Sequence, residues 1–158
     1  MTMRQWVTGV TVVTSAFANE RSGMTVSSFT SVSVEPPTVL VCVNKQAYTH
    51  GIIAKSGVYA ISLLSAGQAA LSNRFAGMEA GITDRFADLA IRTAETGSPL
   101  LPGAIAWLDC RVRQMIDTST HTIYIAEVMY AQVEADLEPL AYHNRQYRLL
   151  IDLPAQDD

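Results

Sequence analysis

Short runs of β-branched and apolar residues dominate this chain and predict a protein built mainly of strands. Residues 7–14 alternate between apolar and polar positions, and residues 18–23 have the composition of a turn. Further strands are expected at residues 24–34, 39–43, 58–64, 104–116, 121–133, 140–143 and 147–151. A two-residue turn at Asn144 and Arg145 would join the last two strands as a hairpin.

Helical periodicity is confined to two short segments. Residues 50–55 can form one short helix, and residues 66–76 follow Ser65, which with Gln68 forms a capping box. Residues 77–102 show little periodicity, so we expect a long excursion with a helical turn at 84–89. Because strands outnumber helices and alternating βα units are absent, the pattern predicts an antiparallel β barrel or sandwich.

Composition places the chain among compact proteins with a partly covered apolar surface. Its 158 residues suit one domain over residues 1–158, and 49% of them are hydrophobic while 16% are charged. We therefore expect another subunit or a ligand to cover apolar surface, with a homodimer as the simplest arrangement. The net charge is −4 and basic residues are scattered, which argues against a nucleic-acid surface.

Cysteine and histidine usage excludes several kinds of site. Cys42 and Cys110 lie in apolar runs without metal or redox spacing, so we expect two buried free thiols in a cytoplasmic protein. His50, His121 and His143 have no ligand spacing, and no metal site is expected. No apolar run approaches the ~20 residues that span a bilayer. The phosphate loop, the nucleophile elbow and the dinucleotide-binding glycine motif are all missing from the sequence.

The run over residues 24–34 is unusual because hydroxyls fill a predicted strand. Ser27, Ser28, Ser31 and Ser33 would form the solvent face of an amphipathic strand on the simpler interpretation. Alternatively they line a pocket for a polar, planar ligand, since a rigid strand presents hydroxyls and backbone N–H groups at fixed positions. The next strand, at residues 39–43, is fully apolar and is joined through a turn at residues 36–37, so we expect the two to form a hairpin in the middle of a sheet. The apolar neighbour favours the pocket interpretation more than periodicity alone does.

Several polar residues elsewhere suit an anionic ligand but also have plainer interpretations. Asn44 and Lys45 end a predicted strand, and Thr49 opens the helical turn that follows, a combination that suits phosphate. Arg74, next to Phe75 at a helix end, can equally be a cation that interacts with the helix dipole. Two further candidates, His121 at a strand edge and Tyr142 in the last hairpin, can be ordinary surface residues.

Taken in order, these segments resemble the short flavin reductases, small NAD(P)H-dependent components that supply reduced flavin to two-component monooxygenases. The resemblance is carried by GVTVVTS, GMTVSSFTSVSVEPPTVLVCVNK, SGVYAISLL, Gln68 with Arg74-Phe75, Asp84-Arg85-Phe86, the strand with Cys110, STHTIYIAEV and PLAYHNRQYRLL. It implies a mainly β, flavin-binding split barrel with a few short helices, a homodimer with flavin near the subunit interface, and FMN or FAD reduced by NADH or NADPH. A separate oxygenase would receive the reduced flavin.

The resemblance also implies roles for individual residues. The cofactor-binding set would be Thr25, Val26, Ser27, Ser28, Cys42, Asn44, Lys45, Thr49, Arg74, Phe75 and Tyr142. Of these, Thr49 and Arg74 would hold phosphate, and His121 would meet the nicotinamide as the catalytic candidate. Hydride chemistry belongs to the cofactors, so the protein needs stacking geometry and hydrogen bonds but no strong acid or nucleophile.

The chain departs from the family pattern at several positions. Ala47 stands where a phosphate-binding serine is common, Thr120 replaces an aspartate before His121, and Ala126 replaces a glycine. Relatives carry a helix before the first strand, so the sequence is expected to begin at a truncated start. The missing aspartate leaves open a flavin-binding or redox-sensing module without turnover. Oxidation of a pyridoxamine-type amine is disfavoured because the arginines are scattered.

Overall fold

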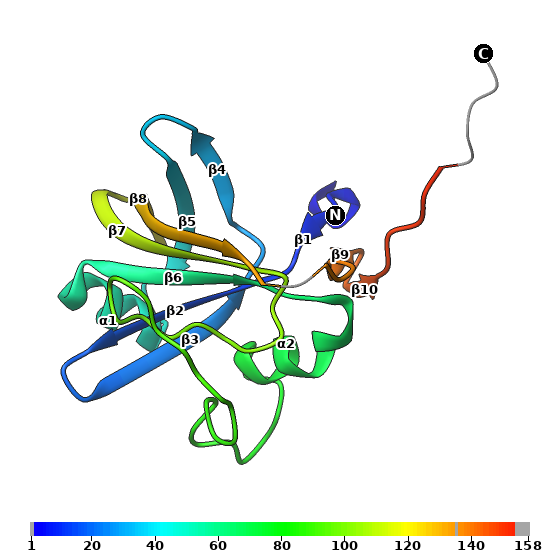
Figure 1. Ribbon diagram of the computed structural model, residues 1–158, viewed down its shortest axis with the longest axis horizontal. Helices are drawn as coiled ribbons and strands as arrows, with labels where there is room; N and C mark the ends of the chain where they lie inside the picture. Colours follow the sequence, from blue (N-terminus) through cyan, green and yellow to red (C-terminus); the bar gives the residue numbers. More distant parts are fainter. Residues whose placement is uncertain (1, 135, 154–158) are drawn as a thin grey trace.

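The computed structural model describes residues 2–134 and 136–153, and strands are its main regular structure (Figure 1). The strands are β1 (Thr8–Gly9), β2 (Thr11–Phe17), β3 (Glu20–Val26), β4 (Thr30–Ser33), β5 (Thr38–Asn44), β6 (Val58–Leu63), β7 (Ala106–Asp117), β8 (His121–Val133), β9 (Ala141–His143) and β10 (Gln146–Arg148). The helices are α1 (Tyr48–Ser56) and α2 (Ala69–Phe75), with short 3-10 segments at Thr2–Gln5 and Ala66–Gln68. The mainly β class predicted from the pattern is confirmed.

Within the described residues, seven strands form one antiparallel sheet in the order β3-β2-β6-β7-β8-β5-β4. The sheet curls around a core that includes Val13, Val41, Tyr59, Ile61 and Tyr124, all fully buried. One face of each central strand supplies these side chains, as the two-residue period of a strand requires. The sheet therefore forms a barrel, and its open side lies between β3 and the β4–β5 hairpin (Figure 1).

The run over residues 24–34 is not one strand, and this corrects the sequence prediction. β3 ends at Val26, the chain leaves the sheet over residues 27–29, and β4 then pairs with β5 alone. β4 is the edge strand, so the β4–β5 hairpin lies at the sheet edge and not in its middle as predicted. The sequence pattern did not reveal the break, because the alternation of residues runs through it. At the break the Ser28 side chain, instead of the backbone, pairs with the Cys42 backbone.

Both predicted helices are present, and the capping box at Ser65 and Gln68 is confirmed. Helix α1 ends at Gly57, whose φ of 70° is the left-handed conformation typical of a helix stop. Helix α1 packs against β2 and β3, while α2 packs near the far end of β3. The two helices therefore flank the same strand at opposite ends.

The long excursion predicted at residues 77–102 packs on the sheet, and buried polar groups fix it there. Asp109, fully buried on β7, accepts hydrogen bonds from the backbone and the hydroxyl of Thr96. The backbone N–H of Leu101 donates to Ser62 Oγ at 3.1 Å, and Trp107 Nε1 donates to the carbonyl of Leu101 at 2.8 Å. At the helical turn predicted for 84–89 the chain forms a hydrogen-bonded turn and not a helix: the Ala87 N–H donates to the Asp84 carbonyl and the Leu89 N–H to the Phe86 carbonyl.

A second, three-stranded sheet joins β1, β9 and β10 in the order β1-β9-β10. The predicted terminal hairpin is confirmed, with His143 paired to Gln146 across the turn. Of the two cysteines, Cys110 is buried as predicted, and burial raises the pKa of its thiol. Cys42 is only half-buried, which corrects the prediction. Within the described range, no helix has the length and apolar character needed to cross a membrane.

Candidate functional site

The break after β3 forms the middle of the candidate site. The Ser28 hydroxyl donates to the carbonyl of Cys42 at 2.9 Å and accepts from the Cys42 N–H at 3.2 Å, so it takes the place of a backbone partner. In the part of the chain that the structure describes, the backbone N–H groups of Ser27, Ser28 and Phe29 donate to no protein acceptor. Free N–H groups beside a cavity are suited to a ligand that carries acceptor oxygens or ring nitrogens.

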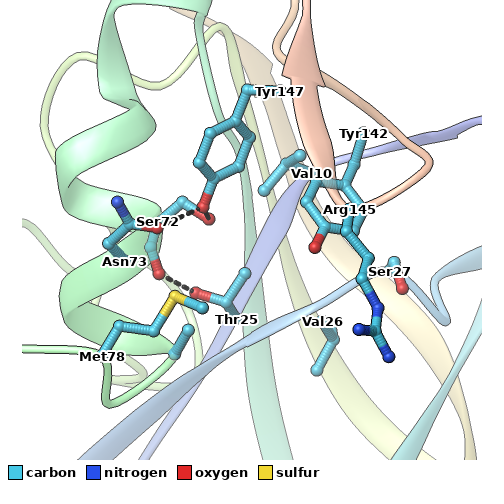
Figure 2. Close-up of a pocket in the computed structure, with 11 residues that line it drawn as sticks. Val10, Thr25, Val26, Ser27, Ser72, Asn73, Met78, Tyr142, Arg145 and Tyr147 are labelled. Carbon is cyan, nitrogen blue, oxygen red and sulfur yellow. Dashed lines mark hydrogen bonds between the residues drawn. The ribbon is translucent and has the colours of Figure 1, made fainter.

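A cavity of about 250 Å³, the central pocket, lies between the end of β3, helix α2 and the β9–β10 hairpin (Figure 2). Its lining residues are Val10, Thr25, Val26, Ser27, Ser72, Asn73, Ala76, Met78, Tyr142, Arg145 and Tyr147. Thr25 Oγ1 donates to the Ser72 carbonyl at 2.7 Å. The Tyr147 hydroxyl donates to Asn73 Oδ1 at 2.7 Å and lies 2.9 Å from Ser72 Oγ. The Thr25 bond holds β3 against α2, and the Tyr147 bonds hold the β9–β10 hairpin against α2. Together they set the width of the pocket.

An adjoining cavity of about 530 Å³, the arginine pocket, shares Thr25 and Ala76 with the central pocket. Its other lining residues are Arg21, Ser22, Gly23, Met24, Ala47, Tyr48, Thr49, Phe75, Ile82, Thr83, Asp84, Arg85 and Phe86. Arg85 Nη1 donates to the carbonyls of Gly23 and Phe75, each at 3.1 Å. Arg21 Nη2 lies 3.2 Å from Asp84 Oδ2. The two guanidinium groups make this the most basic of the three pockets.

Helix α1 adds a second feature suited to anions at the arginine pocket. Its N-cap is Ala47, whose side chain forms no capping hydrogen bond, so the first N–H groups of the helix are not capped by a side chain. Thr49, in the first turn, is buried, and its hydroxyl lies 2.8 Å from Ser22 Oγ. The pocket therefore combines arginines, hydroxyls and a helix N-terminus.

The third and largest cavity, the apolar pocket of about 790 Å³, shares Val10, Ser27 and Tyr142 with the central pocket. Its other lining residues are Met3, Trp6, Val7, Thr8, Gly9, Thr11, Ser28, Phe29, Thr30, Leu40, Cys42, Leu63, Leu64, Ile105, Pro139 and Leu140. Trp6 is 66% exposed at its rim. The cavity is mainly apolar, apart from the hydroxyls at the β3 break, and it has the size of a small-molecule site.

The structure brings most predicted cofactor-binding residues to these three pockets. Thr25, Val26, Ser27 and Tyr142 line the central pocket, Ser28 and Cys42 line the apolar pocket, and Thr49 and Phe75 line the arginine pocket. Phe75 is fully buried and packs edge-on against Phe86 with centroids 5.1 Å apart, so it forms a wall. Ser31 and Ser33 are exposed, as the solvent-face interpretation predicts for them.

Arg74 lies apart from the residue with which it was predicted to share a phosphate. Its guanidinium donates to the carbonyl of Ala87 at 3.3 Å and lies 3.8 Å from Glu79. It lines an adjoining depression of about 280 Å³, which shares Ile82, Thr83 and Asp84 with the arginine pocket that Thr49 lines. The arginines that line the arginine pocket with Thr49 are Arg21 and Arg85.

Asn44, Lys45 and His121 form a group at the end of the β5–β8 pair. Asn44 is directly opposite His121 in the register, and both lie on the strand face that carries Cys42 two residues away. Lys45 Nζ donates to the Thr118 carbonyl at 2.7 Å. The Thr120 hydroxyl lies 2.9 Å from His121 Nδ1. His121 is thus on the same sheet face as Cys42, which lines the apolar pocket, but His121 itself is not one of the described lining residues.

A chain of hydrogen bonds supports this end of the sheet from inside. His50 Nε2 lies 2.9 Å from Thr122 Oγ1, which donates to Asp117 Oδ1 at 2.7 Å. Because the single hydroxyl proton goes to the carboxylate, the hydroxyl accepts from His50, which fixes the Nε2–H tautomer. The Thr122 hydroxyl and then Lys45 hold the pKa of Asp117 below its usual range. The chain joins the first turn of α1 to the strand that begins at His121.

Sequence reasoning missed Arg21, Arg145, Tyr147 and Trp6 as pocket residues. Arg21 and Arg145 stand in predicted turns, where a charged residue is usually solvated. No local sequence pattern distinguishes a solvated turn arginine from one that lines a pocket. Tyr147 was counted only as a strand residue. Arg85 stands in the segment that carries the resemblance, which was the one available signal for it.

Comparison with known proteins is consistent with this geometry. The family model described as "Flavin reductase like domain" matches residues 3–150. The FMN reductase (NADH) RutF of Agrobacterium fabrum is 38% identical over 141 residues, which is 89% of this chain and 80% of that protein. The reductase component of a 4-nitrophenol 4-monooxygenase/4-nitrocatechol 2-monooxygenase from Rhodococcus opacus is 39% identical over 142 residues, 90% of this chain and 74% of that protein.

Solved structures show the same similarity in three dimensions. The NADH:FAD oxidoreductase SgcE6 of Streptomyces globisporus C-1027 superposes with a TM-score of 0.88 at 36% identity, covering 96% of this chain and 90% of that one. The same oxidoreductase in complex with NAD and FAD fragments gives a TM-score of 0.86 at 35% identity, with 99% and 92% covered. On the match over residues 3–150 and these identities, the chain belongs to the flavin reductase like domain family.

Proposed function

We propose that this protein is an NADH:flavin oxidoreductase that reduces FMN or FAD and passes the reduced flavin to a separate oxygenase. The observation that carries the proposal is the row of three adjoining cavities along β3 and the chain break that follows it, basic at one end and mainly apolar at the other. A flavin nucleotide has the same polarity, with phosphate at one end and a planar ring system at the other. The names of the relatives support this assignment, since they are reductases of FMN or FAD that use NADH.

The residues present fit a flavin nucleotide. Free N–H groups at Ser27 and Ser28 would bind polar atoms of the ring, and Tyr142 would pack against the bound molecule. Arg21, Arg85 and the N-terminus of α1 would hold phosphate. When bound, flavin supplies the redox chemistry by accepting a hydride equivalent from the nicotinamide. The chain contributes position and exclusion of water.

We also propose that the molecule acts as a homodimer through the outer face of β5 and β8. Leu40 and Cys42 on β5 stand opposite Ile125 and Ile123 on β8, so one continuous apolar strip runs along this face. Ile116 on β7, 41% exposed, extends the strip. Leu40 and Cys42 also line the apolar pocket, so a second subunit on this face would close that pocket and desolvate the ligand.

In this arrangement His121 lies at the rim of the covered face and would contact the nicotinamide. The Thr120 hydroxyl lies 2.9 Å from its Nδ1, so the ring is oriented by a neutral group and not by a carboxylate. The same feature favours the alternative function, a flavin-binding or redox-sensing module without turnover. The two functions differ in whether NADH is consumed.

The test is oxidation of NADH or NADPH by the purified protein in air, with and without FMN or FAD, followed by nicotinamide absorbance. We expect flavin-dependent consumption of NADH at a higher kcat/KM than NADPH. Binding of flavin without oxidation of either nicotinamide would support the module and exclude the reductase. Addition of a purified oxygenase component from a related system tests whether the reduced flavin is released in usable form.

A further inference from the structure

The turn that joins β7 to β8 places His121 at the start of β8 and is held by hydrogen bonds. Residues 117–120 are exposed, so burial of apolar surface does not fix this turn. The Thr118 N–H and hydroxyl both donate to the His121 carbonyl, at 2.9 and 2.7 Å, and the hydroxyl oxygen accepts from the His121 N–H at 3.2 Å. The position of His121 therefore depends on polar contacts for which water competes.

Lys45, which follows β5, contacts this turn at three points. Its backbone N–H donates to the Thr120 carbonyl at 3.0 Å, and its Nζ donates to the Thr118 carbonyl at 2.7 Å. Nζ also lies 3.5 Å from Asp117 Oδ1. The Asp117 side chain is 73% exposed, so this ion pair contributes little by itself, whereas the short bond from a charged donor to a carbonyl is the stronger contact. The Lys45 side chain thus ties the end of β5 to the β7–β8 turn.

These contacts support a role for Lys45 other than the cofactor contact predicted from the sequence. Among the described residues that line the central, arginine and apolar pockets, Lys45 does not occur. Its ammonium group is directed to the Thr118 carbonyl and to Asp117 instead. The side chain is therefore placed to act on the turn and not on a molecule in those pockets.

Asp117 extends the contact into the barrel. It accepts from Thr122 Oγ1 at 2.7 Å, and the same oxygen lies 2.9 Å from His50 Nε2 on α1. Thr122 is buried, and His121 before it lies on the opposite face, since successive side chains of a strand alternate. The inner face of this end of the hairpin is thus anchored, and the outer face presents the His121 ring.

We propose that Lys45 is a positioning residue that acts through the β7–β8 turn to hold His121 at the nicotinamide site. This inference rests on the proposed function, in which His121 contacts the nicotinamide. Without the Lys45 ammonium group, the turn keeps its internal bonds and the Lys45 backbone bond but loses its charged contact. The His121 ring then occupies a wider range of positions, and a small displacement of a contacting group weakens productive binding of the nucleotide.

The experiment measures kcat and KM for NADH at saturating FMN, and the dissociation constant of FMN by flavin fluorescence. Lys45→Met keeps the apolar stem and removes the charge, while Lys45→Arg restores a charged donor. Lys55→Met is the matched control, because Lys55 is the only other lysine of the chain, is exposed at the end of α1, and forms no side-chain hydrogen bond or ion pair with the described residues. This control also removes one positive charge, so it reports any general effect of net charge on the anionic NADH.

We expect Lys45→Met to raise the KM for NADH about two- to fivefold, less than removal of the ring in His121→Ala, with kcat and FMN affinity little changed. Lys45→Arg should lie close to the parent protein, and Lys55→Met should match it. Thr118→Val, which removes the hydroxyl bonds to His121 and leaves Lys45 in place, should also raise the KM.

Two further measurements separate a positioning role from a direct contact. In the His121→Ala background, Lys45→Met should have no further effect on the KM for NADH, because no ring is left to position. The NMR signals of the His121 ring, identified by their loss in His121→Ala, should shift in Lys45→Met and stay in place in Lys55→Met.

An unchanged KM in Lys45→Met, or unmoved His121 signals, would overturn the inference and leave the reductase proposal intact. An equal rise in KM with and without the His121 ring would also overturn it, since Lys45 would then bind the nucleotide itself. Weaker FMN binding by Lys45→Met but not by Lys55→Met would make Lys45 a flavin ligand, with the same consequence. If the parent protein oxidised no NADH with either flavin, both the proposed function and the inference would be wrong.

Discussion

Replacement of Gly23 by alanine should destabilise the barrel where it meets the arginine pocket. A Cβ at this position would lie 2.8 Å from Phe75 Cε1, 3.0 Å from Phe75 Cδ1 and 3.0 Å from Thr14 Cγ2. Ordinary carbon contacts begin near 3.4 Å, so the ring must move by about 0.6 Å. The ring is fully buried and braced edge-on by Phe86, which leaves it no empty space to enter.

Two opposing effects set the size of the change in the free energy of unfolding. Overpacking of a well-packed core costs about 1–3 kcal/mol. The lower freedom of alanine in the unfolded chain offsets about 0.4–1 kcal/mol of that cost. We therefore expect the free energy of unfolding of Gly23→Ala to fall by about 1–2 kcal/mol. Because Gly23 and Phe75 both line the arginine pocket, FMN affinity should fall as well.

Urea unfolding measures the change in stability, and flavin fluorescence measures the change in affinity. Gly51→Ala is the control, because no atom lies within 4 Å of its added Cβ on the exposed face of α1, and it should gain about 0.5–1 kcal/mol. The double variant with Phe75→Leu should lose less than the sum of the two single changes, since the smaller side chain relieves the clash. A Gly23→Ala protein as stable as the parent would refute the argument from packing.

Three further predictions concern the catalytic candidate, the hairpin and acid stability. His121→Ala should raise the KM for NADH about three- to tenfold with flavin affinity little changed, and unchanged kinetics would remove His121 from the site. Tyr147→Phe should lose about 1 kcal/mol in urea unfolding because Asn73 Oδ1 loses its donor; no loss would mean that the hairpin is held by packing alone. The Phe86 N–H and then Arg21 hold the pKa of Asp84 below its usual range, so its contribution to stability is present above the ordinary carboxyl pKa and lost as pH falls through the lowered value. Thermal unfolding of Asp84→Asn should therefore vary less with pH in acid than that of the parent, and identical pH profiles would contradict this.

The hydrophobic pattern and short motifs in the sequence were sufficient to predict most strands and both helices of the barrel. Alternation located β2 and β7, and apolar runs located β5, β6 and β8, to within a few residues. Successive residues of β5 alternate between the core and half-buried positions, whereas β2 and β6 are buried on both faces over much of their length. The capping box at Ser65 and the terminal hairpin depend on local geometry alone, and both were predictable. The break at residues 27–29 was not, because Ser28 continues the alternating pattern while its hydroxyl takes over backbone pairing with Cys42.

The sequence by itself determined the fold class, and its motifs indicated the family and the serine-rich part of the site, since these follow from local periodicity and short motifs. Only the tertiary structure decided which residues share a pocket. It placed Arg21 and Arg85, far apart in sequence, in one pocket with Thr49, and it placed Arg74 in an adjoining depression. The reason is physical, because a cation's role depends on the groups that long-range folding brings within a few ångströms of it, and no local pattern records that distance.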